Sequence, residues 1–174
     1  ALDISNSMNV KDIEGGKSRL DLAKKTMQQA IGAASVAKVG ILVFAGSVYP
    51  HLPLTPDKKA AKVYTQQVET DMMSHQGTNI GLALLKSADF FSEEPYQRLV
   101  VLITDGEDHE GMLDEGLASL AAADAHLFIY GIGTKKGGLV PVNPKNKSQG
   151  YLKDENGNPA LSKLNEGMIA EIAK

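Results

Sequence analysis

The chain of 174 residues contains no cysteine and no tryptophan, and only 5% of its residues are aromatic. Without cysteine it forms no disulfide and offers no thiolate to a metal ion. No apolar run approaches the roughly 18 residues of a transmembrane helix. The formal charge of −3 is small and the basic residues are scattered, which gives no electrostatic footprint for nucleic acid. With 43% apolar and 22% charged residues, residues 1–174 have the composition and length expected of one globular domain.

Several catalytic motifs are also missing. The sequence has no G-x-S-x-G nucleophile elbow and no H-E-x-x-H zinc motif. Gly131 and Gly133 end an apolar run, but no third glycine completes a dinucleotide-binding fingerprint. The common signatures of serine hydrolases, zinc proteases and nicotinamide enzymes are therefore absent.

Strand and helix patterns alternate along the chain. Apolar runs at 39–45, 99–103 and 127–133 predict strands that are buried on both faces. Residues 48–54 carry Pro50 and Pro53, so this segment can be an edge strand or a loop but not a central strand. Helical spacing and start signals predict helices at residues 18–34, 55–70, 78–88, 113–125 and from 165 onward. The alternation predicts a Rossmann-like α/β fold, with an open, mostly parallel sheet and helices on both faces.

We also have expectations for the first strand, the last helix and a hairpin that precedes this helix. Only Ala1 and Leu2 precede Asp3, whereas a buried strand usually has about five residues, so we expect the first strand to be incomplete here. The last helical pattern, at 166–174, is expected to be cut short as well. Asn156-Gly157 predicts a small hairpin near residues 150–162, inserted before the last helix.

Polar side chains follow the predicted strands at three places. Asp3, Ser5 and Ser7 alternate after the first strand, Thr78 stands at a helix start, and Asp105 follows the run at 99–103. The carboxyl ends of parallel strands meet at one edge of the sheet, where ligands bind. Carboxylate and hydroxyl oxygens suit a hard divalent cation. Plainer interpretations stay open at this point: a polar capping loop, an ordinary helix cap and an Asp-Gly turn.

Together, the D-x-S-x-S, G-T-x-I-G and T-D-G segments resemble the von Willebrand factor A domain family. The resemblance implies a metal-ion-dependent adhesion site (MIDAS) that binds a divalent cation, usually Mg²⁺, with Mn²⁺ or Ca²⁺ as alternatives. It implies direct bonds from Ser5 and Ser7, a water-mediated role for Asp3, and direct or water-mediated bonds from Thr78 and Asp105. In this family a partner protein's Asp or Glu completes the coordination, so the implied function is protein binding and not catalysis.

Four further segments are similar to the bacterial Bat proteins, which are named for aerotolerance. They are L-D-I-S-N-S-M, F-A-G, L-T-P-D and the late Y-L-K-D-E-N-G-N-P stretch. This resemblance implies a full-length protein that is associated with the bacterial inner membrane through segments outside these 174 residues, on a side that stays open. It also implies other Bat proteins and an AAA+ ATPase of the MoxR type as partners, and no nucleic acid.

An enzyme remains the alternative hypothesis. A magnesium-dependent phosphohydrolase could use Asp3 as its nucleophile, but that chemistry usually has a second Asp two residues later, where this chain has Ser5. It also needs a lysine placed for the phosphoryl group, which the sequence does not identify. Near the predicted site, the acidic stretch at 107–110 is expected to be a solvated loop, and His75 and His109 are expected to be surface residues.

Overall fold

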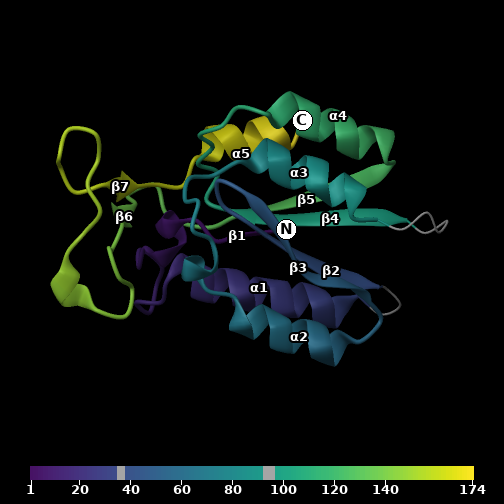
Figure 1. The fold of residues 1–174 in the computed structure, drawn as a ribbon, viewed down its shortest axis with the longest axis horizontal. Helices are drawn as coiled ribbons and strands as arrows, with labels where there is room; N and C mark the ends of the chain where they lie inside the picture. Colours follow the sequence, from purple (N-terminus) through teal and green to yellow (C-terminus); the bar gives the residue numbers. More distant parts are fainter. Residues whose placement is uncertain (35–37, 92–96) are drawn as a thin grey trace.

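The computed structural model describes residues 1–34, 38–91 and 97–174. Its centre is a five-stranded sheet in the order β3-β2-β1-β4-β5 (Figure 1). The strands are β1 (Leu2–Asp3), β2 (Val39–Phe44), β3 (Val48–Thr55), β4 (Arg98–Thr104) and β5 (Ala125–Gly131). All neighbouring pairs are parallel except β2 and β3. The short strand β1 lies in the middle, so its carboxyl end opens at the centre of one edge of the sheet.

Helices cover both faces of the sheet, as predicted (Figure 1). One face carries α1 (Arg19–Ala33) and α2 (Lys58–Gln67), and the other carries α3 (Ile80–Asp89), α4 (Leu113–Ala122) and α5 (Glu166–Ile172). Side chains alternate between the two faces along each strand, so each face has its own core. Val43 packs toward α1 and α2, whereas its neighbour Phe44 packs toward α3 and α4.

The first helix starts where the sequence indicates. Ser18 is the N-cap of α1, its hydroxyl accepts from the Asp21 N–H at 3.1 Å, and the Asp21 carboxylate accepts from the Ser18 N–H at 2.9 Å. This reciprocal capping box satisfies two of the free N–H groups at the helix start. The predicted start of α2 is wrong by two residues: Asp57, not Thr55, is the N-cap, and Pro56 precedes the helix.

The prediction for β5 is wrong in one respect. The segment is a strand, but it lies at the edge of the sheet, and Phe128 and Tyr130 are 61% and 49% exposed. A continuous apolar run does not reveal whether its strand is central or lateral. The proline-containing β3 is the other edge strand, as the prolines indicated.

Residues 134–163 form an arm that stands beyond the carboxyl end of the sheet (Figure 1). Its strands β6 (Gly138–Leu139) and β7 (Leu161–Ser162) pair antiparallel, and single bridges join Pro141 to Tyr151 and Lys153 to Pro159. The second bridge closes a turn around Asn156-Gly157, where the Gly157 N–H donates to the Asp154 carbonyl at 3.0 Å. Within the described ranges, the structure has no helix that is long and apolar enough to span a membrane.

Candidate metal centre

Two serine hydroxyls meet directly after β1. The chain leaves the strand at Ser5 and turns through a short 3-10 helix, Asn6–Asn9. This turn brings Ser5 Oγ and Ser7 Oγ to 2.9 Å from each other, and both residues are buried. Each hydroxyl retains lone pairs beyond this shared hydrogen bond, so the pair offers two convergent oxygen ligands.

Asp3 lies below the serine pair at the end of β1 and is fully buried. Its Oδ1 accepts from the Ser5 N–H at 2.9 Å, and its Oδ2 accepts from the Thr104 hydroxyl at 2.6 Å. Burial, and then the nearby charge of Asp105, raise the pKa of Asp3 to about 7. The carboxyl group is thus held in one orientation but lacks enough positive charge around it to stay ionised easily.

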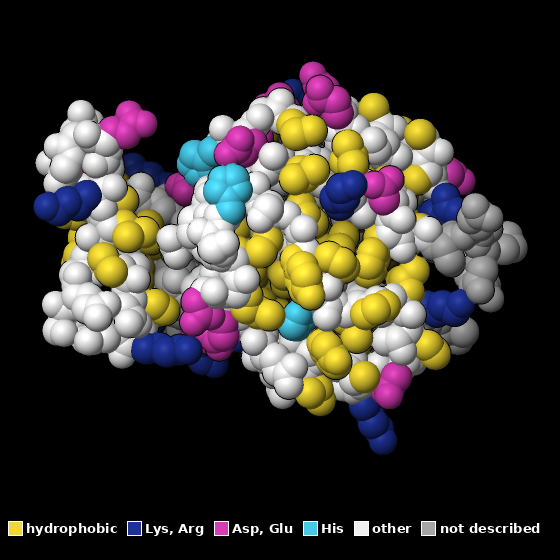
Figure 2. All heavy atoms as spheres, viewed as in Figure 1, with side chains coloured by type: hydrophobic (Ala, Val, Ile, Leu, Met, Phe, Trp, Pro, Cys, Tyr) yellow, Lys and Arg dark blue, Asp and Glu magenta, His cyan; other side chains and the backbone are white. Residues whose placement is uncertain are grey.

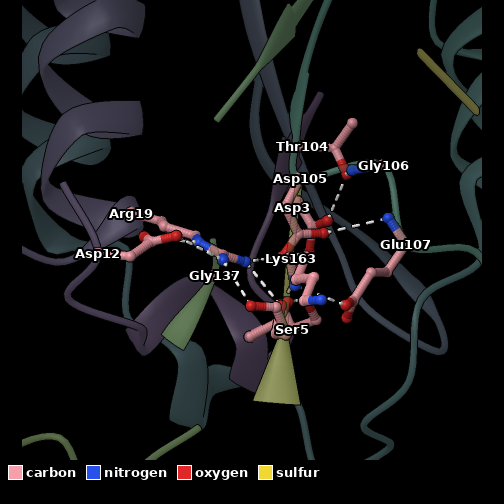
Figure 3. A network of polar contacts seen from close by, with 12 residues as sticks. Asp3, Ser5, Asp12, Arg19, Thr104, Asp105, Gly106, Glu107, Gly137 and Lys163 are labelled. Atoms are coloured by element: carbon pink, nitrogen blue, oxygen red, sulfur yellow. Dashed lines mark hydrogen bonds and ion pairs between the residues drawn. The ribbon is translucent and has the colours of Figure 1, made fainter. Parts of the chain in front are cut away.

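Asp105 follows β4 and reaches the same place (Figure 3). Its Oδ1 accepts from the Glu107 N–H at 3.2 Å, and its Oδ2 accepts from Arg19 Nη1 at 2.8 Å. The turn depends on Gly106, which has a φ of +78° and lies so close to the Asn165 carbonyl that a Cβ would be 2.8 Å from it. A side chain at this position would be strained in both respects.

Thr78 lies at the same edge but is not linked to the other four predicted ligands. Its carbonyl accepts from the His109 N–H at 2.9 Å, and the next residue, Asn79, donates to the Ala45 carbonyl after β2 at 2.9 Å. Among the described residues, no hydrogen bond joins the Thr78 side chain to Asp3, Ser5, Ser7 or Asp105. The N-cap of α3 is Asn79, whose side chain accepts from the Leu82 N–H. The cap interpretation of Thr78 is therefore wrong, and its buried hydroxyl serves no cap.

Sequence reasoning missed the main cation of the site, Arg19. Its side chain is fully buried, contacts Asp105 and forms a bidentate pair with Asp12, with Nε to Oδ1 at 3.0 Å and Nη2 to Oδ2 at 2.8 Å. It also donates to the Ser162 hydroxyl at 2.7 Å and the Ser162 carbonyl at 3.1 Å. Burial opposes the charge of Arg19, but Asp12 and Asp105 outweigh it and raise its pKa. The local sequence around Arg19 does not indicate that this side chain is buried, because basic residues near the start of a helix are usually exposed.

The predicted solvated acidic loop is wrong for two of its members. Glu107 is half-buried, accepts from the Lys163 N–H at 3.3 Å, and has a pKa raised by burial and by Asp105. Asp108 accepts from the Ile80 N–H at 3.0 Å and so helps to satisfy the start of α3. His75 and His109 are exposed, as expected of surface residues.

The charges and distances of this centre fit a small divalent cation. The centre has two carboxylates, Asp3 and Asp105, and one guanidinium, Arg19, which pairs with Asp105 and also with Asp12, so negative charge is in excess. The 2.9 Å between the serine hydroxyls equals the spacing of neighbouring oxygens around an ion bound octahedrally at about 2.1 Å. No group of three or more His, Asp or Glu side chains suited to a metal occurs in the described residues, so hydroxyl oxygens or water would complete the coordination of an ion here.

Comparisons with known proteins identify the family of this chain. A family model described as the von Willebrand factor type A domain matches residues 1–107. BatB from Bacteroides thetaiotaomicron superposes with a TM-score of 0.90 at 36% identity, covering 99% of this chain and 82% of that one. An aerotolerance-related membrane protein from Bacteroides fragilis superposes with a TM-score of 0.89 at 35% identity, covering 99% of this chain and 83% of that one.

A more distant structure shares the fold alone. Proximal thread matrix protein 1 from the mussel byssus, with a zinc-occupied MIDAS motif, has a TM-score of 0.62 at 20% identity, covering 74% of this chain and 36% of that one. A search of curated proteins finds no significant match. The family match over more than half of the chain and the likeness to the two Bacteroides proteins lead to one conclusion: the chain belongs to the von Willebrand factor type A domain family and resembles the Bat proteins.

Proposed function

We propose that this chain is a metal-dependent protein-interaction module, in which a divalent cation at a MIDAS site binds an acidic residue of a partner protein. The observation that carries the proposal is the buried Ser5–Ser7 hydroxyl pair, 2.9 Å apart, beside the buried carboxylates of Asp3 and Asp105. Hydroxyl ligands add no negative charge, so an ion bound here would remain under-neutralised. An under-neutralised ion retains affinity for a carboxylate from outside.

Each of the five residues has a defined role in this proposal. Ser5 and Ser7 hold the ion directly, and Thr78 contributes its hydroxyl from the neighbouring loop. Asp3 and Asp105 supply the negative charge, directly or through water. The all-oxygen set favours Mg²⁺, with Mn²⁺ or Ca²⁺ as alternatives. The mussel protein, which shares the fold and has zinc in its MIDAS motif, supports the binding of a divalent ion by such a motif.

The proposal also includes a cellular location and a set of partners. The full-length protein would be associated with the bacterial inner membrane and would work in a Bat complex, with a MoxR-type ATPase, in aerotolerance or stress. Support comes from the two Bacteroides proteins, one named BatB and one named an aerotolerance-related membrane protein.

The phosphohydrolase alternative fits the geometry less well. A nucleophilic Asp3 would have to reach a substrate, but its side chain is fully buried, and its two oxygens accept from the Ser5 N–H and the Thr104 hydroxyl. Its raised pKa also lowers the fraction of carboxylate near neutral pH. The cation nearest the site, Arg19, is fully buried and engaged with side chains of the protein itself. These contacts hold Asp3 in a fixed structural position and not as an attacking group.

Calorimetric titration of the metal-free protein with Mg²⁺ and then Mn²⁺ tests the proposal. The matched variants are Ser5→Ala/Ser7→Ala, which removes the hydroxyl pair together with the bond from the Ser5 side chain to Asp3, and Ser87→Ala, which removes a buried hydroxyl of α3 that donates to the Ala83 carbonyl. In the double variant Asp3 keeps the Ser5 N–H and the Thr104 hydroxyl as donors, so no carboxylate is left without a hydrogen bond and the protein should fold.

We expect saturable binding in the wild type and in Ser87→Ala, and none in Ser5→Ala/Ser7→Ala. A peptide that carries one Asp should then bind only when the ion is present. Equal metal binding by the double variant and the wild type would refute the assigned site.

A further inference from the structure

The arm differs in charge from the rest of the chain. Residues 134–163 contain six lysines and only Asp154 and Glu155 as acids, a formal charge of +4, whereas the whole chain is −3 and the remainder is therefore −7. Lys135 pairs with Glu166 at 2.9 Å. Lys136 and Lys163 are exposed and form no ion pair with any described residue. The base of the arm thus presents uncompensated positive charge.

One face of the arm is apolar and unpacked. Leu139 and Leu161 are directly opposite each other in the β6–β7 pair, so they lie on the same face, and they are 38% and 54% exposed. Tyr151, opposite Pro141, is 52% exposed. The opposite face packs inward, with Val140 buried and Ser162 held by Arg19. Figure 2 shows hydrophobic side chains at the surface of the arm, between basic ones, and a notch that separates the arm from the body.

The base of the arm is tied to the candidate metal centre by several hydrogen bonds. Arg19 donates both to Asp105 and to Ser162, so one guanidinium joins the centre to β7. The Lys163 N–H donates to Glu107, and the Asn165 N–H donates to the Asp105 carbonyl at 2.9 Å. These contacts fix the arm next to the metal centre, with Lys163 one residue away from Ser162.

We propose that the arm is the specificity surface of this module: it binds an acidic segment of a partner protein whose lead carboxylate occupies the metal centre. Further acidic side chains of that segment would face Lys136 and Lys163, and its apolar side chains would pack on Leu139, Tyr151 and Leu161. The proposal rests on the proposed function, because the lead carboxylate needs the ion. Beyond the proposed function, it states that the bound partner segment extends from the metal centre along the arm, and that this segment contains acidic and apolar residues.

Charge favours the arm over the other side of the centre. The 107–110 loop is acidic, and an acidic partner would be repelled there. Charge also favours a protein over an anionic membrane. The turn of the arm carries Asp154 and Glu155, and the rest of the chain is negative, so an anionic bilayer would meet repulsion on both sides of the lysines.

Selection from random dodecapeptides displayed on phage, in Mg²⁺, provides the test, followed by fluorescence measurement of Kd for the selected peptides. We expect peptides with one obligatory Asp or Glu and with additional acidic and apolar residues. Lys136→Glu/Lys163→Glu should weaken their binding about tenfold at low salt, since each exposed pair changes from attraction to repulsion. The glutamine versions should have a smaller effect. Tyr151→Ser/Leu161→Ser should also weaken binding.

The matched controls have the same kinds of substitution, Lys→Glu and Tyr→Ser, at positions outside the arm. Lys25→Glu/Lys59→Glu alters the charge on α1 and α2, and Tyr49→Ser alters an exposed aromatic residue of β3. At about 0.15 M salt, where the Debye length is about 8 Å, both should bind the selected peptides within about twofold of the wild type, whereas the arm variants should still bind more weakly.

The outcomes separate this inference from the proposed function. Peptide binding that needs Mg²⁺ and is lost in Ser5→Ala/Ser7→Ala, but is unchanged in the arm variants, would overturn the role of the arm and leave the metal site intact. Failure to select any Mg²⁺-dependent peptide would overturn both. Binding to vesicles of phosphatidylcholine and phosphatidylglycerol that is lost in the arm variants, with peptide binding unchanged, would identify the arm as a membrane contact instead.

Discussion

Arg19 and Asp105 form a fully buried ion pair, with Nη1 2.8 Å from Oδ2. The two residues are 86 positions apart, one at the start of α1 and the other just after β4. All five N–H groups of Arg19 donate hydrogen bonds: two to Asp12, one to Asp105 and two to Ser162. A buried charge is tolerated only when it is paired and hydrogen-bonded in this way. The guanidinium therefore acts as the internal counter-charge of the candidate metal centre.

Replacement of Arg19 by Met should strongly destabilise the metal-free protein. The variant would leave Asp105 buried without a partner and Asp12 without its bidentate cation, and breaking a buried pair in this way costs about 3–5 kcal/mol. Urea unfolding in EDTA measures the loss, with Lys25→Met on the exposed face of α1 as the control. A loss below about 1 kcal/mol would show that the pair contributes little.

Metal should partly reverse the same defect. Because a cation at the centre would supply some of the missing positive charge, Mg²⁺ should raise the unfolding midpoint of Arg19→Met by more than that of the wild type. A midpoint for Arg19→Met that does not respond to Mg²⁺ would contradict the shared electrostatics of Arg19 and the metal site.

Asp3 should make the metal-free protein less stable as the pH rises. Its pKa is about 7 in the folded state, against 3.8 for the ordinary group. Between these values the folded state binds more protons than the unfolded state, so the stability that Asp3 contributes is fully present below about pH 4 and is lost as the pH rises through 7. Each unit of pKa difference corresponds to about 1.4 kcal/mol.

The comparison with Asp3→Asn isolates this effect. The amide can still accept from the Ser5 N–H but does not titrate. The comparison is needed because other titrating groups also change the stability with pH, and they contribute equally to both proteins. In EDTA, the free energy of unfolding of the wild type relative to Asp3→Asn should fall between pH 5 and pH 8. A constant difference would mean that Asp3 keeps an ordinary pKa in the folded state.

The two adjacent residues Thr78 and Asn79 should have separable roles. Asn79→Ala removes the cap of α3 and should cost about 1 kcal/mol of stability, with metal affinity largely retained. Thr78→Ala should have little effect on urea unfolding in EDTA but should weaken Mg²⁺ binding. If Thr78→Ala bound Mg²⁺ as tightly as the wild type, Thr78 would have to be removed from the ligand set.

The sequence predicted this fold well where the local pattern decides the structure. The continuous apolar runs at β2 and β4 are strands, and Ser18 and Asp21 form the cap that their spacing indicates. Patterns that depend on distant partners were harder. The run at β5 did not show that its strand is lateral, because sheet order determines which strands are buried.

The candidate site shows the same limit. Asp3, Ser5, Ser7 and Asp105 could be proposed from motifs, and the structure brings them to one edge of the sheet. Arg19 could not be proposed from any motif, because its partner residues Asp105 and Ser162 are 86 and 143 positions away in the sequence. The identity of the α3 cap was also ambiguous: Thr78 and Asn79 can both cap a helix, and the contact of Asn79 with Ala45 selects one of them.

Close packing of α3 against α4 should make Gly81 intolerant of a side chain. A Cβ at Gly81 would collide with the Met112 carbonyl, whereas a Cβ at Gly32 in α1 would be 3.6 Å from Lys62 Nζ, at the end of a flexible side chain. Gly81→Ala should therefore destabilise by about 1–3 kcal/mol despite the better helix propensity of alanine. Gly32→Ala should be neutral or stabilising in the same urea experiment. Equal effects of the two substitutions would contradict the close packing of α3 against α4.

The central claim is that Ser5, Ser7 and the two carboxylates hold a divalent ion. A crystal grown with Mn²⁺ and measured near the manganese absorption edge tests this claim most directly. We predict one anomalous peak about 2.2 Å from both Ser5 Oγ and Ser7 Oγ, bounded by Asp3, Asp105 and Thr78, and absent from crystals of Ser5→Ala/Ser7→Ala. A peak at a different place, or one that persists in the double variant, would contradict the account.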